Sequence, residues 1–135
     1  MTIQFSTSVR NALLDSFETT ISTSAILKIR TGAQPATCAT ADSGTVLATL
    51  SLPSDWMAAA TDGSKAITGT WSDSSADETG TAGHFRLYAS DGTTCHMQGS
   101  ITVTGGGGDM TLVNTSIAQG QSITISTFTL TAPGA

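Results

Sequence analysis

Residues 83–103, GHFRLYASDGTTCHMQGSITV, decide the fold that we expect for this chain. Apolar and polar residues alternate on both sides of Asp91-Gly92, which is the pattern of two strands that each bury one face. Asp-Gly favours a turn because glycine tolerates positive φ and the Asp side chain can hydrogen-bond to its own backbone. The stretch therefore predicts a β-hairpin at the centre of a sheet. Its inward face would carry Phe85, Leu87, Cys95, Met97 and Ile101, and its outward face would carry Arg86, Tyr88 and His96.

Further strands are expected on both sides of this hairpin. They are predicted at residues 25–31, 45–52, 65–71, 110–113 and 122–131, while residues 55–60 would form a short helical turn or a short edge strand. In the last strand the apolar positions shift by one residue, which predicts a β-bulge near Ser126-Thr127. With about seven to eight strands, the fold class would be all-β, an antiparallel β-sandwich of jelly-roll-like form.

One helix is expected, over residues 8–21. Ser6 and Ser8 are candidate N-caps, because a serine hydroxyl can accept a free backbone N–H there. Apolar residues recur at every fourth position and predict a stripe that packs against an end or edge of the sandwich, with Asp15 and Glu18 on the solvent side. The stripe consists of Val9, Leu13, Phe17 and Ile21. Residues 1–24 would thus form an N-terminal arm and helix, and residues 25–135 the β-sandwich domain.

Composition and charge limit the classes of partner. Among the 135 residues only 11% are charged, and the net charge is −5. Such a chain offers little to neutralise phosphates, so we expect no binding to nucleic acid or to membranes. The N-terminus lacks the basic and apolar regions of a signal peptide, which predicts synthesis in the cytoplasm and free thiols at Cys38 and Cys95.

Two groups of residues resemble metal sites only partly. His84 and His96 lie on opposite arms of the hairpin and would need a third ligand such as Asp91 or Cys95, so we interpret both as solvent-facing strand residues. Asp73, Ser75 and Asp77 have the spacing that opens a calcium loop, but Glu78 stands where that loop needs glycine. We expect neither a metal nor any other cofactor.

Catalytic and carbohydrate-binding interpretations are equally weak. No GxSxG motif is present, and the glycines at 105–108 lack the lysine of a phosphate-binding loop. Trp56 and Trp71 could form a platform for sugars, although we expect at least one of them to lie in the core. The sequence therefore predicts no enzyme and no catalytic residue.

Five segments together resemble a family of small structural proteins of tailed phages, in the class of head decoration or cement proteins. They are TSVRNALLDSFETTI (7–21), LKIRTGAQPA (27–36), GTVLATLSL (44–52), SDSSADETGTAGHFRLYASDGTT (72–94) and GGGGDMTLVNTSIAQGQSITISTFTLTAP (105–133). The most specific of them is TGTAGHFRLYASDGTT, followed by the glycine-led C-terminal region.

The resemblance implies a protein without catalytic residues that binds the major capsid protein on the outside of the virion. Self-association as a dimer or trimer on the capsid is also implied, and residues 1–7 with the helix are the candidate docking arm. The alternative is a carbohydrate- or receptor-binding module of a tail or fibre that uses Trp56, Trp71 or Tyr88 for stacking. A third interpretation is a small hydrolase that depends on His84 and His96.

Overall fold

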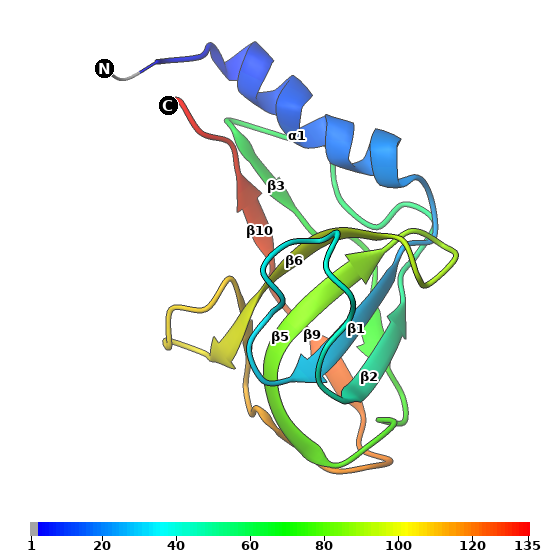
Figure 1. Cartoon of the computed structure of the whole chain (residues 1–135). Helices are drawn as coiled ribbons and strands as arrows, with labels where there is room; N and C mark the ends of the chain where they lie inside the picture. The colour runs from blue at the N-terminus through cyan, green and yellow to red at the C-terminus, as the bar shows by residue number, and fades with distance from the viewer. Residues whose placement is uncertain (1–2) are drawn as a thin grey trace.

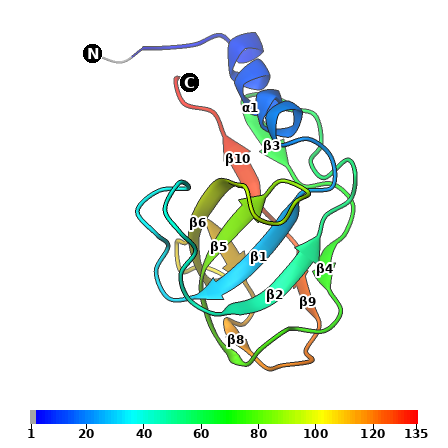
Figure 2. The same cartoon turned by 45° about the vertical axis from the view of Figure 1, so that its right-hand side comes forward.

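The computed structural model describes residues 3–135 and shows a mostly β fold with one helix (Figure 1). The largest sheet curls into a half-barrel, as Figures 1 and 2 show. Its strands follow the order β2 (Val46–Ser51), β1 (Ile26–Thr31), β5 (Gly80–Tyr88), β6 (Cys95–Val103) and β7 (Met110–Leu112), and β8 (Ser116–Ile117) pairs with the start of β5. The predicted hairpin is β5–β6, and its position at the centre of the sheet is confirmed.

The turn of the hairpin also follows the prediction. Gly92 has a φ of 71°, and the Asp91 carboxylate accepts the backbone N–H groups of Thr93 and Thr94 at 2.9 Å. Hydrogen bonds from Thr94 and Thr93 lower the pKa of Asp91 to about 2. The connection between the strands spans residues 89–94, so it is longer than a two-residue turn. The bonds to Asp91 order its second half.

The predicted strands at 65–71 and 122–131 are wrong as continuous strands. Each is broken in two, into β3 (Ser64–Ala66) and β4 (Trp71–Asp73) and into β9 (Ile123–Ile125) and β10 (Thr129–Thr131). The pieces pair crosswise, β3 with β10 and β4 with β9. The one-residue shift near Ser126-Thr127 therefore marks a break between two strand pairs, not a β-bulge.

Two further expectations differ from the structure. The β6–β7 pair is parallel, so the sheet is not wholly antiparallel. Residues 55–60 form neither a helical turn nor a strand, and only Met57 makes an isolated bridge, to Ile67. No helix in the part of the chain that the structure describes is long and apolar enough to cross a membrane.

A chain of four aromatic rings joins the half-barrel to the short strand pairs. Trp71 lies 6.1 Å from Trp56 and 6.0 Å from Phe128 between ring centroids, and Phe128 packs edge-on against Phe85 at 5.5 Å. All four side chains are buried. The expectation that at least one tryptophan belongs to the core is confirmed for both.

Replacing Gly83 with alanine is expected to lower the free energy of unfolding by about 2 kcal/mol. A Cβ atom there would lie 2.3 Å from the carbonyl oxygen of Gly32, which is backbone and cannot move without shifting β1's exit from the sheet. Urea denaturation checks this, with the exposed Thr81→Ala in the same strand as the control. Equal effects of the two substitutions would contradict the close approach.

Candidate interaction surface

The helix α1 (Thr7–Ile21) lies beyond one end of the half-barrel, next to β3 and β10 (Figures 1 and 2). Its predicted extent is confirmed to within one residue, and Ser6 is the N-cap, accepting the Val9 N–H at 3.2 Å. The chain before the helix meets the C-terminal end, where the Phe5 N–H donates to the Gly134 carbonyl at 2.8 Å. Met1 and Thr2 of the predicted docking arm lie outside the described residues.

A buried lysine on β3 holds the helix. Lys65 is 2% exposed, and its Nζ lies 2.7 Å from the Asp15 carboxylate and 3.5 Å from that of Glu18. It also donates to the Ala58 carbonyl at 2.8 Å. Asp15 and Glu18 were predicted on the solvent side. The Asp15 side chain is indeed 47% exposed and that of Glu18 24%, but both carboxylates also face Lys65, because a buried ammonium group needs charged and polar partners.

Other polar side chains extend this contact along the same side of the helix. Arg10 donates to the Ala132 carbonyl at 3.0 Å, and Asn11 accepts the Gly63 N–H at 2.8 Å. Asp15 accepts the Ala60 N–H at 2.9 Å. The hydrogen bond from Lys65 is the largest of the effects that lower the pKa of Asp15. The first half of the helix is therefore attached by its polar residues.

As a consequence, only the C-terminal half of the apolar stripe of the helix is buried. Ile21 is buried and Phe17 packs against the core, as predicted, but Val9 and Leu13 are 45% and 44% exposed. Ile3 and Phe5 just before the helix are 59% and 40% exposed. We call these four residues, Ile3, Phe5, Val9 and Leu13, the apolar arm. Val9 and Leu13 are one turn apart on the same side of the helix, and neighbouring exposed apolar side chains are typical of protein interaction sites.

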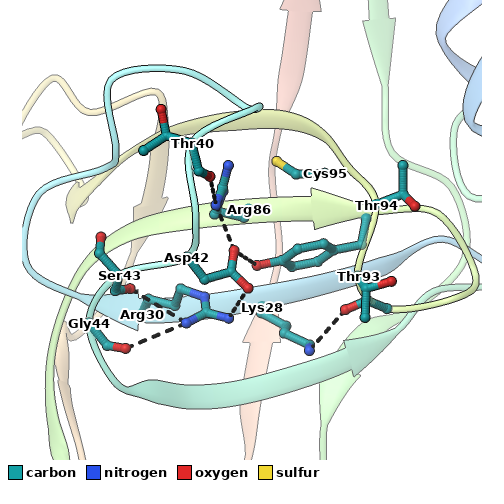
Figure 3. Close-up of polar contacts among 12 residues, drawn as sticks. Lys28, Arg30, Thr40, Asp42, Ser43, Gly44, Arg86, Thr93, Thr94 and Cys95 are labelled. Carbon is teal, nitrogen blue, oxygen red and sulfur yellow. Dashed lines mark hydrogen bonds and ion pairs between the residues drawn. The ribbon is translucent and has the colours of Figure 1, made fainter.

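The second notable feature is a loop, residues 32–45, that crosses the outer face of the half-barrel (Figure 3). We call it the covering loop. Arg86 of β5 lies beneath it and donates to the carbonyls of Thr37 at 3.3 Å, Cys38 at 2.8 Å and Thr40 at 3.0 Å. Gln98 of β6 donates to the Pro35 carbonyl at 2.7 Å. The outward face of β5, with His84, Arg86 and Tyr88, is thereby removed from solvent.

Asp42 is the centre of the contacts between the loop and the sheet. Its carboxylate lies 2.6 Å from Arg86 and 2.9 Å from Arg30, and it accepts the Tyr88 hydroxyl at 2.7 Å. Burial raises its pKa, but the Tyr88 hydrogen bond and the two guanidinium groups outweigh burial and hold the pKa below the usual 3.8. Burial and the bond to Asp42 raise the pKa of Tyr88 to about 12. At neutral pH Asp42 is therefore ionised and the Tyr88 hydroxyl keeps its proton, as the contacts of the loop require.

The two histidines are not brought together. His84 pairs with Ser100 across the hairpin, is fully buried and lies with Nδ1 2.8 Å from the Gly32 carbonyl. His96 is exposed, as expected. The interpretation of His84 as a solvent-facing residue is wrong, because the outward face of β5 is covered. Within residues 3–135, no three His, Cys, Asp or Glu side chains are grouped to hold a metal ion.

The segment that resembles a calcium loop is structural. Asp73 accepts the backbone N–H groups of Thr49 and Ser75, and Asp77 accepts the Thr49 hydroxyl at 2.8 Å. These carboxylates hold the segment against β2. Their oxygens do not converge on a shared point with a third ligand among the described residues.

The proposed stacking surface for sugars is wrong. Trp56, Trp71 and Tyr88 are each at most 1% exposed. An open hollow of about 390 Å³ beside the C-terminal half of the helix is lined mainly by hydroxyl and carboxylate groups, and it presents no histidine or cysteine. The described surface thus offers the apolar arm as its clearest candidate for binding.

The contacts of Asp42 with Arg30 and Arg86 were not predicted from the sequence. Arg86 was placed correctly on the outward face, but nothing local predicts that a loop covers that face. The available signal was composition: Arg30 and Arg86, two of only five lysine and arginine residues, directly follow Ile29 and Phe85 in central strands.

No family model matches the chain, and no curated protein or solved structure is significantly similar to it.

Proposed function

We propose that this protein is a structural protein of a tailed-phage virion, a decoration or cement protein that binds the major capsid protein and stabilises the head. It would be made in the host cytoplasm and carried on the capsid exterior, with self-association as a dimer or trimer there. It needs neither catalysis nor a cofactor. The proposal also takes the half-barrel and its two strand pairs as a reduced, jelly-roll-like form of a β-sandwich.

The exposed apolar arm is the observation that carries this proposal. A helix of a monomeric protein normally buries its apolar stripe, because burying a large apolar side chain is favourable by about 1.5–3 kcal/mol. Here polar bonds from Arg10, Asn11 and Asp15 turn Val9 and Leu13 towards solvent. The arrangement leaves apolar area free to be buried against a second protein.

The chemistry of the helix favours a protein partner over a membrane. The helix carries one basic residue, Arg10, and two acidic residues, Asp15 and Glu18, so it has no net positive charge to attract anionic lipid. Binding to the assembled lattice and not to its separate subunits would shift the equilibrium towards the intact shell. Several copies acting together would add avidity.

The copy number of this protein in purified virions tests the proposal. Quantitative mass spectrometry relative to the major capsid protein is expected to give one copy per capsid subunit, or a simple fraction of it. Absence from the particle would overturn the assignment to a virion. A handful of copies would instead place the protein in the tail, neck or fibre and overturn the decoration role.

The double substitution Val9→Gln/Leu13→Gln is expected to weaken attachment to undecorated capsids by roughly 30- to 100-fold. That corresponds to about 2–3 kcal/mol for two apolar anchors at an interface. Glutamine is a good helix former and both positions are exposed, so the melting temperature is expected to stay nearly constant. Occupancy is measured by co-sedimentation with the particles.

Val113→Gln is the matched control. Val113 is 90% exposed and lies far from the helix in the sequence, just after β7. Its replacement removes a similar exposed apolar side chain and should leave occupancy unchanged. If the double variant and the control attach equally well, the apolar arm is not the docking surface.

A further inference from the structure

Both cysteines lie on the outer side of the half-barrel. Cys95 was predicted on the inward face, but the register shift between Leu87 and Tyr88 places it on the outer one, opposite Tyr88. Cys38 belongs to the covering loop, and Cys95 is the first residue of β6, opposite Tyr88 of β5. Both are free and partly buried. After burial, the neighbouring Cys38 thiol is the largest contribution that raises the pKa of Cys95. Arg86 donates to the Cys38 carbonyl at 2.8 Å, and Cys95 lies next to Arg86 on the outer face of the β5–β6 pair (Figure 3), so the two cysteines flank one side chain although they are remote in the sequence.

The backbone on both sides of this pair is fixed. Arg86 donates to the Cys38 carbonyl at 2.8 Å and to the Thr40 carbonyl at 3.0 Å, which holds the loop over β6. Gln98 fixes the preceding segment through the Pro35 carbonyl at 2.7 Å. Figure 3 shows the Cys95 side chain under the loop, with its sulfur directed towards Thr40 and Arg86.

Nothing strong competes for the Cys95 thiol. Its hydrogen bond to the Met97 carbonyl is 3.4 Å long, and a thiol is a weak donor. Rotation of the Cys95 side chain towards Cys38 therefore costs little free energy, because it breaks only this weak hydrogen bond. Two cysteines can be joined without moving the backbone only where their Cα atoms lie within about 7 Å of each other.

We propose that Cys38 and Cys95 are a redox pair, which a small-molecule disulfide such as oxidised glutathione converts into an intramolecular disulfide that fastens the covering loop to β6. One thiolate attacks the glutathione disulfide, forms a mixed disulfide and releases one reduced glutathione. The second thiolate attacks the protein sulfur of that mixed disulfide and releases the other. Two thiols are oxidised, one disulfide is reduced, and the two thiol protons end on the two glutathione molecules.

Either thiolate can make the first attack on the external disulfide. The other acts as the resolving thiol, since the attack on the mixed disulfide is intramolecular. In the setting proposed above, the pair stays reduced in the cytoplasm and oxidises on the released particle.

The test is incubation of the purified full chain with oxidised glutathione, followed by intact-mass and peptide-map analysis. The expected product is a monomer lighter by two hydrogen atoms, with no free thiol and with the peptides of Cys38 and Cys95 cross-linked. Its melting temperature should rise by about 10 °C and fall back on reduction with dithiothreitol.

Single-cysteine variants test the resolving step. Cys95→Ser should accumulate the glutathione adduct at Cys38, and Cys38→Ser should accumulate it at Cys95, because neither variant has a second thiol to displace glutathione. Two thiols that stay free, stable adducts on the unsubstituted chain, or cross-linked dimers on a non-reducing gel would each overturn the proposal. Because the main experiment uses the natural sequence, a variant that fails to fold does not affect it.

Discussion

Replacing Asp42 with asparagine is expected to lower the free energy of unfolding by about 3 kcal/mol. The carboxylate neutralises two guanidinium groups, those of Arg30 at 6% exposure and Arg86 at 1%, and no other ion pair of either arginine is found among residues 3–135. Removing it leaves two buried positive charges close together. The side chain of Asp42 is itself 39% exposed, so we place the effect at the lower end of the range for buried pairs.

In the Asp42→Asn variant, the covering loop should be the first part of the chain to detach from the sheet. Limited proteolysis of the variant is expected to cut within residues 32–45, where the unsubstituted protein resists. Urea denaturation followed by circular dichroism gives the change in stability. The control is Asp55→Asn, the same chemical change at an exposed carboxylate, which should stay within about 0.5 kcal/mol. Equal stability of the two variants would show that Asp42 does not hold the loop.

The same carboxylate predicts how stability depends on pH. Its pKa in the folded protein is below the ordinary value of 3.8, so its contribution is complete above that value and is lost as the pH falls through the folded pKa. Between about pH 5 and about pH 3, the unsubstituted protein should therefore lose more stability than Asp42→Asn does. Comparison with the variant cancels the contributions of other carboxylates such as Asp15. Parallel curves for the two proteins would contradict this role of Asp42.

The elements that could be predicted from sequence are those specified by neighbouring residues. The β5–β6 hairpin combines alternation with an Asp-Gly turn, and the helix combines a serine cap with a four-residue repeat. In both cases the deciding contacts lie within a few positions of one another. The location of the sheet centre followed from the hairpin itself.

The elements that could not be predicted depend on distant partners. The side of the helix that is buried is decided by Lys65, which lies far along the chain and overrides the amphipathic pattern. The interruption between β9 and β10 depends on the separate partners β4 and β3. The sequence predicts that the face of β5 with Arg86 is exposed to solvent. In the structure the covering loop buries it, and no residue near Arg86 in the sequence indicates this. The N-terminal arm and helix were named as the candidate site from the sequence. The exposure of Val9 and Leu13 was not predicted, because both belong to the apolar stripe that was expected to be buried.

Replacing Trp71 with alanine is expected to have the largest effect of all, a loss of about 4 kcal/mol in the free energy of unfolding. The indole contacts both Trp56 and Phe128, and its Nε1–H donates to the Trp56 carbonyl at 3.0 Å. Trp71 is also the first residue of β4 and pairs with Ile125 of β9. A cavity there would separate the half-barrel from the strand pair that closes it. Since domains of this size are stable by only about 5–15 kcal/mol, the variant should be close to unfolding at physiological temperature.

Trp71→Phe separates the two contributions of this side chain. It keeps an aromatic ring next to Phe128 but removes the donor, leaving the Trp56 carbonyl without that partner. We expect a loss of about 2 kcal/mol, roughly half of the alanine effect. Circular dichroism in urea measures both variants without relying on tryptophan fluorescence, which the substitutions alter. If Trp71→Phe proves as damaging as Trp71→Ala, the hydrogen bond and not the packing of the ring holds the strand pair, and the chain of aromatic rings is not the structural link between the two halves of the fold.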